Sequence, residues 1–253
     1  MSGLFHYWRR PRRCYLLCGV ARSGSNLLSD GLQDTDLAGR PHQFFLPSSE
    51  SRFRTKYRFA AEMNFAEYVR SVVEKTATPN RVFGFKLMGW YLNDFLGRLR
   101  QTGAFGGDES SDLEVLRNAF PRLLFIQITR REKLRQAISK ARAVQTGLWK
   151  VKEGKTEAAE PRFDRPLITR CLNEAEEQEN TWSAFFARIG LQPCRVEYEE
   201  LCQNYEATVR AVLDFLEIVL PRRIKINRPV TIRQGDALSA EWEQRYRASD
   251  TLH

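Results

Sequence analysis

The chain has few cysteines, and their positions argue against two common kinds of small-protein scaffold. The five are scattered and odd in number, and none belongs to a C-x-x-C pair or a Cys/His cluster. A zinc site and a disulfide framework therefore have no support in the sequence. We expect buried free thiols in a reducing cytoplasm, namely Cys14, Cys18, Cys171, Cys194 and Cys202.

A membrane-spanning segment is also missing from the sequence, because no hydrophobic run approaches the roughly 20 residues that a bilayer requires. The N-terminal stretch YWRRPRRCYLLCGV is basic and then apolar, as a signal peptide is. Its apolar part is short, however, and leads into a glycine-rich loop rather than a small-residue cleavage site. We interpret residues 1–13 as a basic lead-in to the first strand.

Positive charge is in excess, with a net charge of +9, while the hydrophobic share of 42% is ordinary for a globular protein. The excess points to an anionic partner. WRRPRR is the one dense basic run, and no zinc-finger, RNA-recognition or helix-turn-helix signature occurs. We therefore favour a small, highly charged ligand. A basic protein that binds nucleic acid, or that binds a nucleotide without catalysis, is the alternative.

Apolar runs of strand length alternate with segments of helical periodicity along the chain. We expect strands at 14–20, 81–88, 121–130 and 194–198, and helices at 25–33, 64–77, 91–100, 132–149, 167–189 and 199–219. A turn and a short helix are expected within 228–248, and loops at 36–51, 103–112 and 150–166, the last exposed and charged. The alternation predicts one α/β domain over residues 1–253, with a central, mainly parallel sheet flanked by helices.

The stretch CGVARSGSNLL (18–28) nearly matches the phosphate-binding loop G-x-x-x-x-G-K-S/T. Gly19 and Gly24 have the required spacing, but Ser25 replaces the lysine and Asn26 replaces the hydroxyl that would hold Mg²⁺. The strand at 121–130 also ends in Arg130 where a magnesium site would need a carboxylate. ATP-dependent chemistry is therefore not expected.

The same loop still offers groups that bind anions. Backbone N–H groups at a helix N-terminus, the guanidinium of Arg22 and the hydroxyls of Ser23 and Ser25 fit a phosphate or sulfate held without metal. An ordinary strand–helix turn is the alternative interpretation of the loop taken alone. Ligands of parallel sheets bind at the carboxyl ends of the strands, where the loop, Lys86 and Arg130 are all expected.

Several stretches together resemble the bacterial trehalose 2-sulfotransferase family, whose members depend on 3′-phosphoadenosine-5′-phosphosulfate (PAPS). They are RSGSNLL (22–28), GRPHQFF (39–45), FGFKLM (83–88), ITRREKLRQAISKARAVQTGLW (128–149) and IRQGDALSAEWEQRYR (232–247). The resemblance implies a P-loop-like sulfotransferase fold and metal-independent transfer of a sulfuryl group to a hydroxyl of a small acceptor, such as a sugar, glycolipid or phenol. It also implies a homodimer.

The resemblance assigns roles at the donor end of the site. Arg22, Ser23, Gly24 and Ser25 match the loop that holds the 5′-phosphosulfate, and Asn26 stands where the family more often has threonine. Arg130 and Ser139 match the residues that hold the 3′-phosphate. Arg233 to Gly235 match more loosely and are expected to close over the nucleotide, with a structural turn as the alternative. For Arg130 the alternative is a surface ion pair.

Lys86 is expected to support the sulfuryl group or the bridging oxygen, together with Arg22 as a stabiliser of charge on the leaving phosphate. A side chain that merely extends from a strand end into water is the alternative for Lys86.

The acceptor end departs from the family. Gln43 stands where the relatives carry the glutamate proposed as the base, and Arg40 replaces a second acidic residue that contacts the sugar. With His42 and Phe44, these residues are expected to contact the acceptor. Three explanations stay open: His42 is the base, the acceptor is acidic enough to need little help, or the protein binds the donor without efficient turnover. Neighbouring residues of an extended loop point in opposite directions, so His42 does not simply take the place of Gln43, and a hydrogen-bonding role in the loop is the alternative for His42. We favour an active enzyme whose acceptor differs from trehalose and carries negative charge.

Overall fold

The computed structural model describes residues 11–149, 160–221, 224–227 and 237–248. Its sheet contains β1 (Arg13–Gly19), β2 (Val82–Met88), β3 (Leu123–Thr129) and β4 (Cys194–Glu197), in the order β2-β1-β3-β4. All three strand pairings are parallel. The expected α/β fold with a parallel sheet is thereby confirmed.

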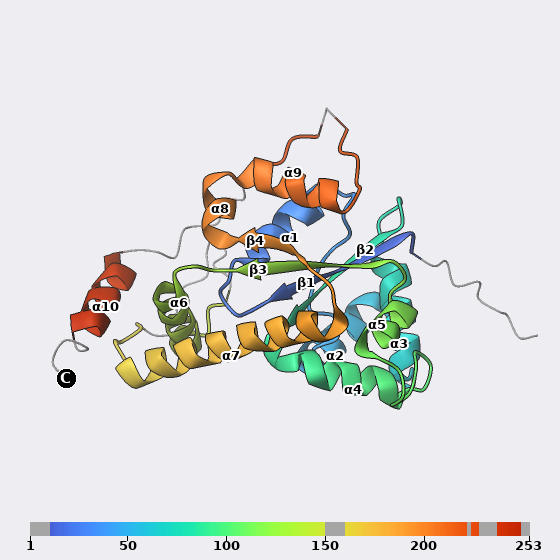
Figure 1. The fold of residues 1–253 in the computed structure, drawn as a ribbon, viewed down its shortest axis with the longest axis horizontal. Coiled ribbons are helices and arrows are strands. Elements are labelled where there is room, and N and C mark those ends of the chain that lie inside the picture. The colour runs from blue at the N-terminus through green and yellow to red at the C-terminus, as the bar shows by residue number, and fades with distance from the viewer. Residues whose placement is uncertain (1–10, 150–159, 222–223, 228–236, 249–253) are drawn as a thin grey trace, which may run out of the picture.

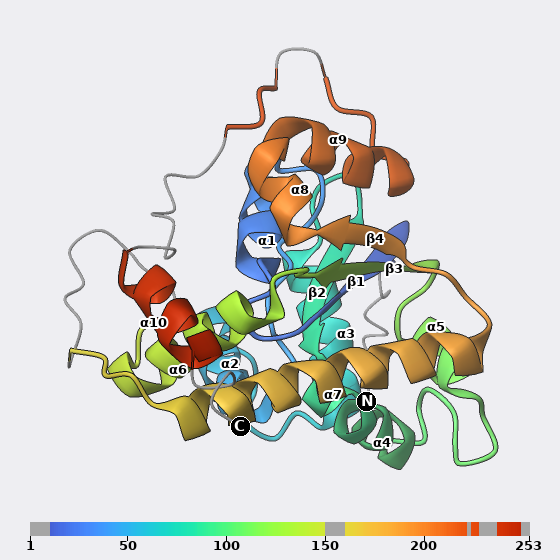
Figure 2. The same ribbon diagram turned by 60° about the vertical axis from the view of Figure 1, so that its left-hand side comes forward.

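Helices cover both faces of the sheet (Figures 1 and 2). One face carries α1 (Ser25–Asp34), α8 (Tyr198–Gln203) and α9 (Tyr205–Phe215). The other carries α2 (Pro47–Tyr57), α3 (Phe65–Thr76), α4 (Leu92–Gln101), α5 (Asp112–Ala119) and the long α7 (Arg165–Ile189). At the carboxyl ends of the strands, α6 (Lys133–Thr146) packs against α7 and α10 (Ala237–Ala248), and a short 3₁₀ turn, η1 (Gly89–Tyr91), follows β2.

The alternation of side chains along β1 explains why both faces are covered. Tyr15 and Leu17 are buried against α1 and α9, whereas Leu16 and Cys18 are buried in an aromatic-rich core against α3, α4 and α7. Successive strand residues point to opposite faces, so an entirely apolar strand requires cover on both. Four of the five cysteines are buried, Cys194 is partly buried, and all are free thiols, as expected.

The strand order creates a switch point between β1 and β3. From β1 the chain crosses to β2 on one side and then returns past β1 to β3 on the other. At such a point the chain leaves the two strand ends in opposite directions, and ligands of this fold class bind there, at the carboxyl edge of the sheet. The loop after β1 and Arg130 after β3 meet at this edge, in the region that we name the crevice.

Two helices were not expected from the sequence. We expected no regular structure over 36–51, but α2 begins there at Pro47, because proline is well suited to the first turn of a helix, where its missing N–H has no partner to lose. The expected loop at 103–112 is followed directly by α5, whose N-terminus is fixed by a capping box between Ser111 and Glu114.

Three helix boundaries also differ from expectation. The helix expected at 132–149 ends at Thr146, because Gly147 adopts the left-handed conformation (φ 71°) that terminates helices. The helix expected at 199–219 is divided at Asn204 into α8 and α9. In the expected connection at 150–166, the N-cap Asp164 already starts α7. No helix among the described residues is long and apolar enough to cross a membrane.

Candidate functional site

The loop between β1 and α1 turns sharply before the helix begins. Arg22 and Gly24 both have positive φ, 65° and 90° respectively. A Cβ on Gly24 would lie 2.4 Å from the ring of Tyr198, so this position requires glycine for its backbone conformation and for space. Within the ranges that the structure describes, no side chain caps α1, so its first-turn N–H groups suit an anion.

Arg22 is fixed by contacts from the other side of the crevice. Its Nε donates to Ser139 Oγ at 2.9 Å, and its Nη1 donates to the carbonyl oxygen of Trp149 at 2.6 Å. Burial, followed by the nearby charges of Arg130 and Arg142, lowers the pKa of Arg22 to about 10, while Tyr198 acts in the opposite direction. The site thus holds guanidinium groups that repel one another, and a bound anion would relieve that repulsion.

Arg130 lies beside Arg22 at the end of β3. Its Nη1 makes a long hydrogen bond of 3.5 Å to the carbonyl oxygen of Arg22, and its guanidinium lies over the ring of Tyr198, 4.6 Å from the centroid. Its Nε is buried and has no hydrogen-bond partner among the described residues, although Glu199 Oε1 is 3.9 Å away. A buried guanidinium N–H without an acceptor is suited to a phosphate oxygen.

The ion-pair alternative for Arg130 is only weakly satisfied. Glu199 accepts hydrogen bonds from the backbone N–H groups of Arg131 (3.0 Å) and Glu132 (3.3 Å). Its carboxylate therefore serves the turn that leads into α6 and stays beyond hydrogen-bond distance of Arg130. The 3′-phosphate residues expected from the sequence, Arg130 and Ser139, thus meet at Arg22.

A second cluster joins Lys86, Asn26 and His42. Lys86 lies in β2 with 5% of its surface exposed, and its Nζ donates to Asn26 Oδ1. Its backbone N–H donates to the carbonyl oxygen of His42 at 3.0 Å, where His42 forms an isolated parallel bridge with Phe85. The side chain of Lys86 therefore points to the start of α1, next to the loop after β1, rather than simply into water.

The imidazole of His42 is half-buried among aromatic rings. It stacks on Phe53 with 6.0 Å between centroids and meets Phe44 edge-on at 5.6 Å. Burial, followed by the positive charges of Lys86, Lys56 and Arg52, lowers the pKa of His42 to about 4, against a weaker raising effect of Asp30. His42 is therefore neutral at physiological pH, which is the form that accepts a proton.

The expected acceptor contacts have different environments. Arg40 is exposed and Gln43 is half-buried, and the Gln43 side chain makes no hydrogen bond within the described part of the chain. The expectation for Phe44 was wrong: its side chain is fully buried, packed between Phe53 and Phe83, so it builds the core and does not face an acceptor.

Several contributors were missed in the sequence. Tyr198 and Glu199 follow β4, the neighbour of β3, and the Trp149 carbonyl follows α6. Tyr198 and Glu199 could have been found from the end of the strand expected at 194–198, because the carboxyl ends of parallel strands lie at one edge of the sheet. Arg233 and Gly235 lie outside the described residues. Among those described, no group of three or more His, Cys, Asp or Glu side chains is arranged as metal ligands would be.

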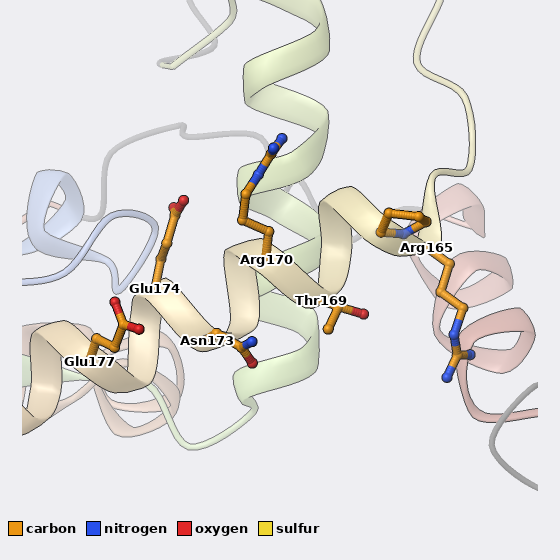
Figure 3. A pocket seen from close by; sticks show the side chains of 7 residues that line it. Arg165, Thr169, Arg170, Asn173, Glu174 and Glu177 are labelled. Atoms are coloured by element: carbon orange, nitrogen blue, oxygen red, sulfur yellow. The ribbon is translucent and has the colours of Figure 1, made fainter.

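A hollow of about 580 Å³ lies elsewhere, along residues 165–177 of α7 (Figure 3). Its polar side chains mainly connect helices: Thr169 hydrogen-bonds Tyr246 of α10, and Glu174 pairs with Lys140 of α6. Of its two arginines, Arg165 is held by α10, where it donates to the carbonyl oxygen of Tyr246 at 2.7 Å and lies over the Tyr246 ring. The crevice between β1 and β3 is therefore the candidate site.

Comparisons with known proteins identify a family for the chain. A family model described as Stf0 sulphotransferase matches residues 14–249. The chain is 31% identical over 269 residues to the trehalose 2-sulfotransferase of Mycobacterium tuberculosis (strain ATCC 35801 / TMC 107 / Erdman), covering 94% of this chain and 96% of the relative. It is 29% identical over 258 residues to the trehalose 2-sulfotransferase of Mycolicibacterium smegmatis (strain ATCC 700084 / mc(2)155), covering 92% and 94%.

Solved structures show the same fold at lower identity. The sulfotransferase domain from the curacin biosynthetic pathway aligns with a TM-score of 0.50 at 13% identity, over 91% of this chain and 83% of that one. A sulfotransferase from Alicyclobacillus acidocaldarius aligns with a TM-score of 0.50 at 15% identity, over 94% and 92%. These likenesses concern the fold alone.

Proposed function

Because the chain belongs to the Stf0 sulphotransferase family, we propose that it transfers a sulfuryl group from PAPS to a hydroxyl group of a small acceptor. Membership of this family confirms the expectation of an enzyme that transfers sulfate. Both curated relatives bear the name trehalose 2-sulfotransferase, which supports a sugar hydroxyl as the position of attack. The homodimer and the cytoplasmic location stay predictions.

The observation that carries the proposal is the meeting of Arg22 and Arg130 at the crevice. Two guanidinium groups that share a poorly hydrated site repel each other, and this repulsion contributes to the lowered pKa of Arg22. The buried Nε of Arg130, which has no hydrogen-bond partner in the described part of the chain, adds a donor without an acceptor. A ligand with separated phosphate groups, as PAPS has, satisfies both features.

The residues present fit such a donor. The uncapped N-terminus of α1 and the loop residues Ser23, Gly24 and Ser25 would hold its 5′ end, and Arg130 with Ser139 would hold its 3′-phosphate. PAPS supplies an activated sulfuryl group for in-line displacement. Arg22 and the loop N–H groups stabilise negative charge that develops on the leaving phosphate.

Lys86 and Asn26 position the reacting groups. The Nζ of Lys86 is held at Asn26, on the first turn of α1, so its positive charge lies beside the donor loop. There it stabilises charge on the transferring group and lowers the pKa of His42. The ammonium group of Lys86 thus acts both on the transferring sulfuryl group and on the proposed base, His42.

His42 is the proposed acceptor of the hydroxyl proton. Its imidazole is neutral at physiological pH, and with a pKa near 4 it has about the basicity of a carboxylate. It thereby replaces the carboxylate function that Gln43 cannot supply. The contacts of His42 with Phe44 and Phe53 fix the orientation of the ring.

Binding of adenosine 3′,5′-bisphosphate without magnesium tests the donor site. At a concentration of a hundred times Kd, the ligand should raise Tm by roughly 5–10 °C. Arg130→Ala should remove most of this shift. Arg131→Ala is the matched control, because its neighbouring guanidinium is exposed and pairs with Glu197. Turnover is then followed by mass, with PAPS and a panel of sugars, glycolipids and phenols. Absence of any shift for the unaltered protein at millimolar ligand would overturn the proposal.

A further inference from the structure

Three exposed cations lie around the aromatic rings next to His42. The guanidinium of Arg52 lies 4.7 Å from the ring centroid of Phe53, and Lys56 Nζ lies 5.3 Å from that of Tyr57. Phe53 stacks on Tyr57 with 6.2 Å between centroids, and on His42 at 6.0 Å. Arg52 and Lys56 are four residues apart in α2 and so project from one side of the helix.

Arg40 belongs to the same surface. Its charge acts on Tyr57, where it opposes the rise in the tyrosine pKa that burial causes. We name Arg40, Arg52 and Lys56 the acceptor-side cluster. All three side chains are exposed, so a ligand can reach them.

The cluster has an excess of positive charge at the reacting end of the site. Lys86, Lys56 and Arg52 all act on the imidazole of His42 from the positive side, and Asp30 is the carboxylate that opposes them. These cations keep the imidazole neutral, and together they give this surface a positive potential that attracts an anion. The positive charge is concentrated where an acceptor hydroxyl must approach the proposed base.

Ion pairing on α2 shows a contrast between its two sides. Arg54 pairs with Glu50 at 2.8 Å, and Glu50 also pairs with Arg98 at 2.8 Å. In the part of the chain that the structure describes, by contrast, the members of the acceptor-side cluster form no ion pair. The paired side supports the fold, and the other side keeps its charges available for a ligand.

We propose that the acceptor carries an anionic oxyacid group, which the acceptor-side cluster binds while a hydroxyl of the same molecule lies at His42. This inference rests on the proposed function and names the class of its acceptor: a sugar bearing a phosphate ester, a sulfate ester or a carboxylate. The anion and the reacting hydroxyl occupy separate positions. The charged group therefore determines which molecule binds, and His42 and Lys86 act on the hydroxyl.

Matched pairs of sugars test the proposal. The protein is first saturated with adenosine 3′,5′-bisphosphate, so that phosphates cannot bind at Arg130. Binding is then measured by NMR for glucose against glucose 6-phosphate, glucose 6-sulfate and glucuronate, and for trehalose against trehalose 6-phosphate. At least one anionic member should bind about tenfold or more tightly than its neutral partner, and sulfation with PAPS should show the same preference in kcat/KM. Comparison of glucose 6-phosphate, glucose 6-sulfate and glucuronate shows whether a phosphate ester, a sulfate ester or a carboxylate is preferred.

Two double variants identify the surface responsible. Arg52→Gln with Lys56→Gln should reduce the affinity for the anionic sugar about tenfold and leave the affinity for the neutral sugar unchanged. Lys75→Gln with Arg117→Gln removes the same charge from exposed positions that do not act on His42. This control should change the affinity for neither the anionic nor the neutral sugar. Equal binding within every pair, or an advantage that survives in the first variant, overturns the proposal. Failure of the bisphosphate to bind would instead concern the proposed function.

Discussion

Arg22 Nε donates a hydrogen bond to Ser139 Oγ at 2.9 Å, across 117 positions of sequence. Arg22 was expected at the 5′ end of the donor and Ser139 at its 3′-phosphate. The bond shows that the two expected subsites are directly connected. A ligand that binds both must therefore adapt to an arginine that is already oriented by the protein.

Removal of the Ser139 hydroxyl should weaken donor binding. Ser139→Ala deletes a hydrogen bond to a charged group and a donor for the 3′-phosphate, so the affinity for adenosine 3′,5′-bisphosphate should fall by about tenfold. Isothermal titration calorimetry measures the change, and Ser139→Thr should restore much of it. Ser183→Ala, an exposed hydroxyl bonded to its own helix, is the control. An unchanged affinity in Ser139→Ala would remove this residue from the donor site.

Tyr198 should act through Arg130. The ring supports the guanidinium at 4.6 Å, and such cation–π contacts contribute about 0.5–2 kcal/mol. Tyr198→Leu should therefore weaken bisphosphate binding by about twofold to thirtyfold. Tyr198→Phe retains the ring and should bind normally, which separates the aromatic contact from any role of the hydroxyl. Equal losses in both variants would assign the effect to the hydroxyl.

Gly24→Ala should damage both the fold and the site. Its φ of 90° disfavours alanine, and the added Cβ would lie 2.4 Å from the ring of Tyr198. We expect a loss of about 1–3 kcal/mol in the free energy of unfolding, together with loss of bisphosphate binding. In the double variant with Tyr198→Ala the clash is absent, so stability should partly return while binding does not. Additive losses of stability would contradict a direct steric conflict.

The positions of the donor residues were predictable from the sequence because strand ends are. A glycine-rich loop after one buried strand and an arginine after another must meet if the strands are parallel neighbours. The order of the strands was not predictable, and it is the order that brings Tyr198, after β4, next to Arg130. The contact between Tyr198 and Arg130 thus depends on the strand order, which the sequence of neither strand specifies by itself.

The acceptor side was predicted less well, for two different reasons. The loop composition around Pro47 hid α2, although proline at the start of a helix is favourable. Phe44 was assigned to the acceptor by its place in a motif, whereas its burial depends on packing against Phe53 of α2 and Phe83 of β2, which lie outside that motif. The sequence did not indicate that Arg52 and Lys56 lie near His42, because this depends on where α2 packs.

The titration of His42 should affect stability. Its pKa is lowered from 6.5 to about 4 in the folded protein, so the unfolded chain binds a proton first as the pH falls. The folded state is therefore destabilised between pH 6.5 and pH 4, and this loss is absent above pH 6.5. His42→Gln should lose less stability over this range in urea unfolding curves. The same decline in both proteins would show that His42 titrates normally.

Lys86 provides a direct test of why that pKa is low. Lys86→Met removes the largest charge effect on His42 and leaves burial in place, so the pKa of the imidazole should rise but stay below 6.5. The chain has three histidines, so ¹H–¹³C NMR can follow each ring, with His42→Gln giving the assignment. If His42 is the base, the acid limb of kcat/KM should move upward with this pKa, whatever activity the variant retains. An acid limb that stays in place while the NMR titration moves would assign the proton to another group.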